Sequence, residues 1–175
     1  FVGNLFDMTR IESGMVKPKR EPVELEPLIG EVIARVGKLD PALKVETSIA
    51  EAMPPAMADA QLLEQVLFNL LDNARKYAGT AEPVAIYVRR EDGMAAISVT
   101  DQGRGIPEDE LEAVFEKFHR RARGDGRPAG TGLGLSIARG FVSAMGGTIR
   151  AESPAVRKRG TRFIVRLPLA PEAIP

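Results

Sequence analysis

The chain has 175 residues, of which 24 are Lys or Arg, 24 are Asp or Glu and 44% are hydrophobic. This length and composition fit one globular domain and exclude a disordered or collagen-like chain. The net charge of zero argues against a generic electrostatic nucleic-acid binder. The absence of cysteine excludes disulfides, Cys-ligated metal sites and a thiol nucleophile.

No apolar run approaches the roughly 18 to 20 residues that span a bilayer, and no secretory leader opens the chain. The sequence begins without Met, inside a pattern typical of the end of a helix. We therefore expect it to be a segment of a longer protein, with membrane spans or sensor domains upstream.

The N-terminal residues predict a helix and a linker. Apolar residues recur at near-helical spacing through residues 1–14, ending at Ser13 and Gly14. Residues 17–22 carry the Pro and charge of a short linker. The predicted elements that follow are a strand over 23–25, a helix over 27–38 and short strands over 45–49 and 56–58.

The strongest local signal is a helix over residues 60–77, whose Leu and Val residues step by three and four. At about 100° per residue, Asn69, Asn73 and Lys76 form a row along one border of this apolar stripe, with Gln65 nearby. Polar groups at such a border can face a cleft, although a solvated helix edge is the simpler alternative.

The second half of the chain reads as a hairpin, a loop, a helix and two strands. Residues 83–90 and 94–100 alternate and are joined by a turn with Asp-Gly chemistry, and the second strand ends at Asp101. A loop rich in Gly and Arg precedes a predicted helix over 131–145. Two last strands flank residues 157–160, and the tail from residue 168 onward is expected to fray.

Several familiar motifs are absent. The sequence has no G-x-x-x-x-G-K-[ST] phosphate loop, and neither glycine cluster fits G-x-G-x-x-G. It also lacks H-E-x-x-H, H-R-D and D-F-G, which removes zinc-protease and ordinary protein-kinase assignments.

An ordered set of four short motifs remains. The chain resembles the N, G1, F and G2 boxes of bacterial sensor histidine kinases, whose ATP-binding domain shares its fold with DNA gyrase, Hsp90 and MutL. In chain order, the boxes are Asn69-Leu-Leu-Asp-Asn-Ala-Arg-Lys-Tyr77, Asp101-Gln-Gly-Arg-Gly-Ile-Pro107, Phe115-Glu-Lys-Phe118 and Gly130-Thr-Gly-Leu-Gly-Leu135. Each box alone is a weak signal of this family, but the four boxes in this order are a specific one. Within the family, residues 130–149 look most like the potassium-responsive KdpD type.

The resemblance implies an α/β two-layer sandwich of the Bergerat type, with a mixed sheet of about five strands and about three helices on one face. It implies that residues 1–16 are the end of the second dimerisation helix, 17–22 a linker, 23–169 the ATP-binding catalytic domain and 170–175 a disordered tail.

The implied function is transfer of the ATP γ-phosphate to a histidine on the protein's own dimerisation domain, upstream of this sequence, and then to a response regulator. The implied cofactors are ATP and Mg²⁺, and the implied location is the cytoplasmic side of an inner-membrane sensor. The isolated chain should bind nucleotide without phosphorylating itself. The alternatives are a serine kinase of the anti-sigma-factor type, a free ATPase, or a non-catalytic nucleotide-binding module on the same fold.

Asp101 is the candidate for reading adenine. An Asp at a strand end, followed by glycines with no Cβ, leaves room for a flat base while its carboxylate accepts the exocyclic amine. A turn-capping Asp is the alternative. By resemblance, Asn73 is the Mg²⁺ ligand, and Asn69 orients a water or the metal shell. Lys76 reaches a phosphate, and Tyr77 lies against the base or ribose.

The loop after Phe118 should close over the phosphates. Its candidates are Arg120, Arg121, Arg123 and Arg127, because Arg matches phosphate oxygens bidentately. Phe115 and Phe118 are expected to pack at its base, and His119 is not expected to be the phosphoacceptor. The remaining nucleotide-binding candidates are Gly103, Gly105, Ile106, Gly130, Thr131, Gly132, Leu133, Gly134, Leu135 and Thr161.

Overall fold

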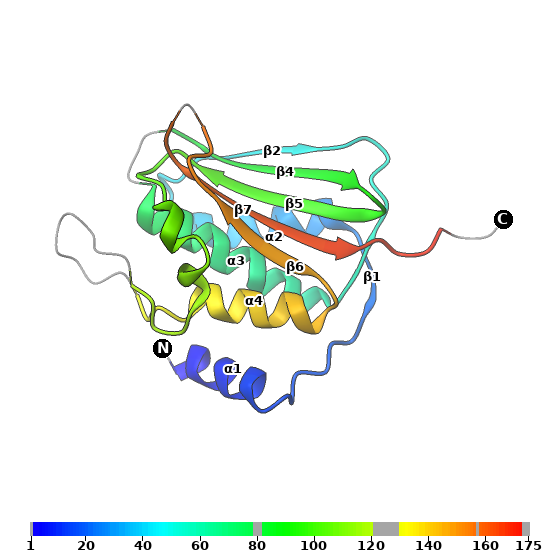
Figure 1. Cartoon of the computed structure of the whole chain (residues 1–175). Helices are drawn as coiled ribbons and strands as arrows, with labels where there is room; N and C mark the ends of the chain where they lie inside the picture. The colour runs from blue at the N-terminus through cyan, green and yellow to red at the C-terminus, as the bar shows by residue number, and fades with distance from the viewer. Residues whose placement is uncertain (1, 79–81, 121–129, 157, 173–175) are drawn as a thin grey trace.

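The computed structural model describes residues 2–78, 82–120, 130–156 and 158–172. Three helices cover one face of a five-stranded mixed sheet, and a further helix, α1, lies beyond α4 on the side away from the sheet (Figure 1). The helices are α1 (Val2–Glu12), α2 (Leu25–Leu39), α3 (Ala60–Tyr77) and α4 (Gly134–Ala144). The strands are β1 (Glu21–Val23), β2 (Val45–Ile49), β3 (Ala56–Ala58), β4 (Val84–Glu91), β5 (Met94–Asp101), β6 (Thr148–Glu152) and β7 (Thr161–Pro168). The predicted two-layer α/β fold is confirmed.

The strand order is β2-β4-β5-β7-β6, with β2 parallel to β4 and every other pair antiparallel. Asp92 and Gly93 join β4 to β5, and both have positive φ, 50° and 75°, as the predicted tight hairpin turn requires. At the other end of β5, Asp101 pairs with Thr161 of β7. The sheet therefore places Asp101 at the end of β5, beside the helical layer. A separate two-stranded sheet pairs β1 with β3.

Helix α3 is the central helix of the lower layer, and its apolar stripe fills the core. Leu63, Val66 and Leu70 are fully buried, as the spacing predicts. The helix begins at an N-cap, because the Asp59 side chain accepts a 3.1 Å hydrogen bond from the Leu62 backbone N–H. The polar row therefore lies at a fixed border of the core.

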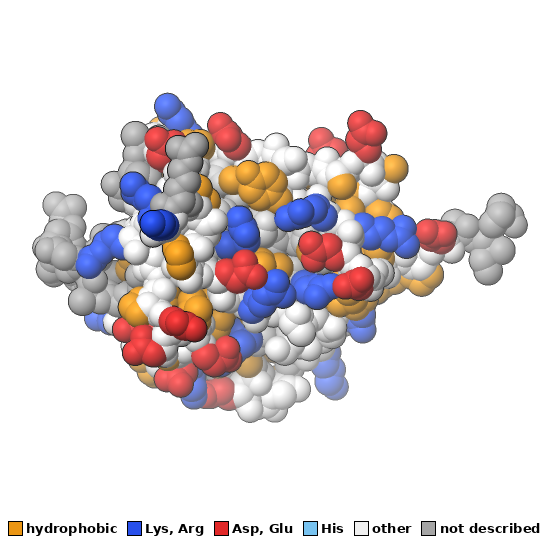
Figure 2. Space-filling model, turned by 45° about the horizontal axis from the view of Figure 1, so that its top comes forward, with side chains coloured by type: hydrophobic (Ala, Val, Ile, Leu, Met, Phe, Trp, Pro, Cys, Tyr) orange, Lys and Arg blue, Asp and Glu red, His pale blue; other side chains and the backbone are white. Residues whose placement is uncertain are grey.

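The opposite face of the sheet is open and polar. Figure 2 shows basic and acidic side chains interspersed across it. Arg162 links both neighbouring strands, donating to Thr100 Oγ1 at 3.2 Å and lying 3.6 Å from Glu152. Such exposed pairs keep the sheet face hydrated, and each contributes little stability.

Helix α1 docks on α4 through one face. Ile11 lies over Gly140, where an added Cβ would meet its side chain at 2.7 Å, and the Ser136 hydroxyl donates to Met8 Sδ at 3.6 Å. Glu12 pairs with Lys117. The other face of α1 exposes Val2 and Phe6 to solvent. No helix among the described residues has the length and hydropathy to cross a membrane.

Candidate nucleotide-binding site

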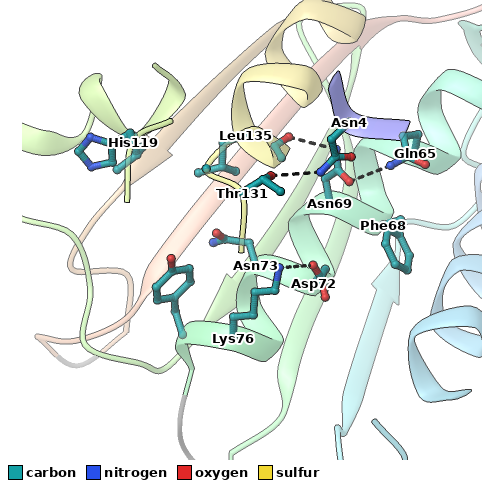
Figure 3. A pocket seen from close by; sticks show the side chains of 14 residues that line it. Asn4, Gln65, Phe68, Asn69, Asp72, Asn73, Lys76, His119, Thr131 and Leu135 are labelled. Carbon is teal, nitrogen blue, oxygen red and sulfur yellow. Dashed lines mark hydrogen bonds and ion pairs between the residues drawn. The ribbon is translucent and has the colours of Figure 1, made fainter. Parts of the chain in front are cut away.

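A pocket lies between α3 and the glycine-rich turn that leads into α4 (Figure 3). It encloses about 140 Å³, whereas pockets for whole ligands of drug size are roughly 300–1,000 Å³, so it has room for part of a nucleotide. The lining residues come from α3, from the turn and the start of α4, and from three outlying positions. They are Asn4, Gln65, Phe68, Asn69, Asp72, Asn73, Lys76, Tyr77, Val114, His119, Thr131, Gly132, Gly134 and Leu135.

Asn69 joins the two walls of this pocket. Its amide nitrogen donates a 3.0 Å hydrogen bond to the Gly134 carbonyl, and its amide oxygen accepts a 2.9 Å bond from the Gln65 amide. Asn69 is buried, so these bonds satisfy an amide that would otherwise lose water without compensation. The residue that the sequence predicts to be catalytic thus also has a structural role.

Lys76 lies at the same wall, about two turns further along α3 than Asn69. Its ammonium is 2.9 Å from Asp72 Oδ2, and Arg75 pairs with the other carboxylate oxygen at 2.7 Å. Burial would raise the pKa of Asp72, but the hydrogen bonds and positive charges of Lys76 and Arg75 outweigh it and lower this pKa. Asp72 therefore remains ionised beside the pocket.

The opposite wall is a turn held open by glycines. Gly130 and Gly132 have φ of 70° and 74°, a region that residues with a Cβ rarely adopt. Thr131 Oγ1 accepts hydrogen bonds from the Leu133 N–H and from the Asn4 amide, each 3.2 Å long. The N-cap residue of α4, Leu133, makes no side-chain capping bond to the first turn of the helix.

The Asp101 loop meets the C-terminal end of α3. The carboxylate Oδ1 of Asp101 accepts a 2.9 Å hydrogen bond from the Gly103 N–H. A Cβ on Gly103 would lie 2.5 Å from the Tyr77 carbonyl oxygen, so only glycine allows this approach. Asp101, Gly103, Gly105, Ile106 and Thr161 are not among the residues that line the described pocket, yet Gly103 touches the helix that does.

Ser153 fixes the shape of that loop. Its hydroxyl accepts a 2.9 Å bond from the Ile106 N–H and donates a 2.8 Å bond to the Gly160 carbonyl. Gly105 has φ of 77°, and an added Cβ there would meet Ser153 Oγ at 2.6 Å. Ile106 and Thr161 are buried. The loop is therefore held from the side of β7 as well as from α3.

The base of the predicted lid differs in part from expectation. Phe115 is buried and packs edge-on against Phe163 at 6.0 Å, which confirms its packing role. The same prediction is wrong for Phe118, which is 62% exposed with φ of 62°, because its backbone turns there to donate to the Gly132 carbonyl.

The two residues after Phe118 lie close to the site. His119 lines the pocket, with Nε2 3.9 Å from Glu110. Arg120 donates to the Gly130 carbonyl.

The predicted lid arginines Arg121, Arg123 and Arg127 lie outside the described residues. The residues at the site that went unpredicted include Asn4, Asp72 and Ser153. The spacing of Asp72 and Lys76 by four on a helix is a signal for their pair. Asn4 and Ser153 carry no such signal, because their partners are far away in sequence.

A sandwich with this strand order and a pocket between its Asn-bearing helix and a glycine-rich turn defines an ATP-binding domain. The chain belongs to the family of histidine kinase-, DNA gyrase B- and HSP90-like ATPases, whose model matches residues 58–171. Within this family it has the catalytic domain of the two-component sensor histidine kinases.

Three similar proteins illustrate this membership. The sensor protein KdpD of Escherichia coli K12 is 38% identical over 98% of this chain and 19% of its own length. The mycobacterial sensor histidine kinase MprB has a structure with a TM-score of 0.73 and 32% identity, covering 87% of this chain and 99% of that one. Full-length ShkA in complex with AMPPNP has a TM-score of 0.82 and 26% identity, covering 99% of this chain and 36% of that one. The chain spans about a fifth of the length of the curated relatives it matches.

Proposed function

We propose that this chain binds ATP with Mg²⁺ and presents the γ-phosphate to a histidine on a dimerisation domain of the same protein. A histidine nitrogen would attack the γ-phosphorus, the bond to the β,γ-bridging oxygen would break, and ADP would leave. A response regulator would then receive the phosphoryl group. One observation carries this proposal: Asn69, Asn73 and Lys76 line a pocket whose opposite wall is the turn through Thr131 and Gly134.

The phosphates would lie between these walls. The N-terminus of α4 supplies backbone N–H groups and the positive end of a helix dipole, which favour an anion there. Lys76 brings a positive charge from α3 to the pocket wall, and Arg120 donates to the Gly130 carbonyl just before the turn residues that line it. Catalysis in such a site consists of positioning the phosphate and neutralising its charge.

The side chains present fit Mg²⁺ held jointly with a nucleotide. No cluster of three His, Cys, Asp or Glu side chains occurs among the described residues, so a site made of protein ligands alone is not offered there. Asn73 would hold the ion through its amide oxygen, with Asn69 orienting a water, since Mg²⁺ takes hard oxygen ligands and retains several waters. The ion would supply charge neutralisation between the phosphate groups.

The base would lie toward the Asp101 loop, in contact with Tyr77. The burial of Asp101 and the close approach of Gly103 to Tyr77 support this placement, because they bring the base-side loop to the end of the phosphate-side helix. Gly105, Ile106 and Thr161 would shape the loop. Leu133, Leu135 and Gly132 would line the nucleotide from the turn.

The domain assignment follows the same proposal. Residues 1–16 would be the end of a dimerisation helix, 17–22 its linker, 23–169 the catalytic domain and 170–175 a tail. The whole protein would be an inner-membrane sensor, with this domain in the cytoplasm. The docking of α1 on α4 supports a helix that arrives from another domain.

The test is phosphoryl transfer from γ-labelled ATP. The chain alone should acquire no label, whereas the full-length protein should acquire one that acid removes, because phosphohistidine is acid-labile and phosphoserine is not. Calorimetry of the chain with ATP and Mg²⁺ should show binding. Acid-stable label, or stoichiometric labelling of the isolated chain, would overturn the histidine-kinase proposal.

A further inference from the structure

Asp72 is an acid on the wall of a pocket proposed to hold a polyanion. Both of its oxygens are occupied by cations of its own helix: Lys76 reaches Oδ2 at 2.9 Å, and Arg75 reaches Oδ1 through Nη2 at 2.7 Å and Nε at 3.0 Å. Figure 3 shows the pair of Asp72 and Lys76 below Asn73. An acid beside a phosphate site costs affinity through repulsion, so it requires a compensating role.

This pair differs from an ordinary pair on a helix surface. The side chains of Asp72 and Lys76 are 20% and 31% exposed, and both line the pocket. Exposed pairs leave long side chains free to move and contribute little. Here both side chains are partly buried, and the 2.9 Å bond to Asp72 holds the lysine ammonium at the pocket wall.

That arrangement places the lysine ammonium at the glycine-rich turn. A Cβ built on Gly130 would lie 2.8 Å from Lys76 Nζ, so the ammonium rests against the backbone of this residue. The Arg120 guanidinium donates to the carbonyl of the same Gly130. Two positive charges, one from α3 and one from the segment after Phe118, therefore meet at the first residue of the turn.

We propose that Asp72 is a positioning residue for phosphate recognition, which holds the Lys76 ammonium at Gly130 before the nucleotide arrives. This inference rests on the proposed function. A free lysine side chain has four rotatable bonds, and fixing it on binding costs conformational entropy. Because an ammonium has three donor hydrogens, Lys76 can keep its bond to Asp72 while it donates to a phosphate. Asp72 therefore repels the phosphates to some extent, but it lowers the entropy cost of binding them by fixing the Lys76 side chain in advance.

The test is a double-mutant cycle read by calorimetry of the chain with ATP and Mg²⁺ and, separately, with adenosine. Asp72→Asn should raise the ATP dissociation constant about three- to tenfold and leave that of adenosine unchanged. In a Lys76→Met background, Asp72→Asn should no longer weaken ATP binding. Asp72→Glu, which keeps the charge, should restore most of the affinity.

Arg75→Met is the matched control, because it removes the other partner of Asp72 and does not line the pocket. It should leave the ratio of ATP to adenosine affinity unchanged. Equal effects of Asp72→Asn in the wild-type and Lys76→Met backgrounds would overturn the positioning role while leaving the proposed function intact. Failure of the wild-type chain to bind ATP at all would overturn both.

Discussion

The side-chain nitrogen of Asn69 donates a 3.0 Å hydrogen bond to the carbonyl oxygen of Gly134, 65 residues further along the chain. This bond joins α3 to the first residue of α4, and these two elements form opposite walls of the pocket. The amide oxygen is occupied by Gln65. One side chain therefore sets the separation between the polar row and the glycine-rich turn.

Replacing Asn69 should lower stability as well as activity. Asn69→Ala removes both hydrogen bonds of this buried amide, each worth about 0.5 to 1.5 kcal/mol, so we expect a loss of about 1 to 3 kcal/mol in the free energy of unfolding. Denaturant titration measures it. Gln65→Ala, which removes only the bond to the amide oxygen, should cost less. A fully stable Asn69→Ala chain would show that the bond to Gly134 does not hold the walls together.

Gly103→Ala should separate the base-side loop from α3. Its new Cβ would lie 2.5 Å from the Tyr77 carbonyl oxygen and 2.8 Å from the Ala78 Cα, both backbone atoms that cannot move aside alone. We expect a loss of about 1 to 3 kcal/mol in stability together with weaker ATP binding. Gly30→Ala is the control: it lies within α2 with open space around it, and alanine favours a helix there by about 0.5 to 1 kcal/mol. Equal melting temperatures for the two variants would contradict this packing argument.

Asp101 should select the base. A charge-assisted hydrogen bond is worth roughly 1.5 to 3 kcal/mol, so Asp101→Ala should weaken ATP binding about 10- to 150-fold and reduce the preference for ATP over GTP. Calorimetry with both nucleotides measures this. Because the Asp101 carboxylate also accepts the Gly103 N–H, a melting curve must accompany the titration. Unchanged ATP affinity in a folded Asp101→Ala chain would refute the base-reading role.

Asp72 should make stability depend on pH in the acid range. Its pKa is lowered in the folded chain, so its contribution is complete above the ordinary value of 3.8 and is lost as the pH falls through the folded pKa below it. The wild-type chain should exceed Asp72→Asn in stability at pH 6 and lose this advantage on acidification below 3.8. Urea unfolding at several pH values measures the difference. A gap that stays constant down to the acid end would contradict the lowered pKa.

Gly140→Ala should loosen α1 without disturbing the core. The added methyl would meet Ile11 at 2.7 Å, whereas the rest of α4 packs on the opposite side. Amide hydrogen exchange in residues 2–12 should become faster, and exchange in α3 should not change. Adding Ile11→Ala should restore slow exchange by removing the clash. If exchange in α1 is already unprotected in the wild-type chain, the docking seen here does not persist in solution.

The sequence predicts the regular parts of this fold well, because their signals are local. The apolar stripe of α3 predicts both the length of this helix and the row of Asn69, Asn73 and Lys76 along it. The Asp-Gly turn predicts the β4–β5 hairpin. Contacts between distant segments are not encoded in a local period. The bond of Asn69 to Gly134 falls in this class, as does the link of Asn4 to Thr131.

The exposure of Phe118 has a similar cause. Its spacing from Phe115 suggests that both rings pack alike. However, the Phe118 backbone N–H donates a hydrogen bond to the Gly132 carbonyl, and the backbone turn that this bond needs directs the Phe118 ring outward. A backbone hydrogen bond between segments overrides the apolar preference of one side chain. Such a bond can be predicted only when the glycine-rich turn is already placed.

The Ser153 hydroxyl bridges Ile106 and Gly160, Arg159 donates to the Gln102 carbonyl, and the Gly160 N–H donates to the Gly103 carbonyl. These bonds fasten the loop after β5 to the connection between β6 and β7. Under the proposed function, a substitution in that connection would therefore reach the base-side loop without changing any residue of the polar row on α3.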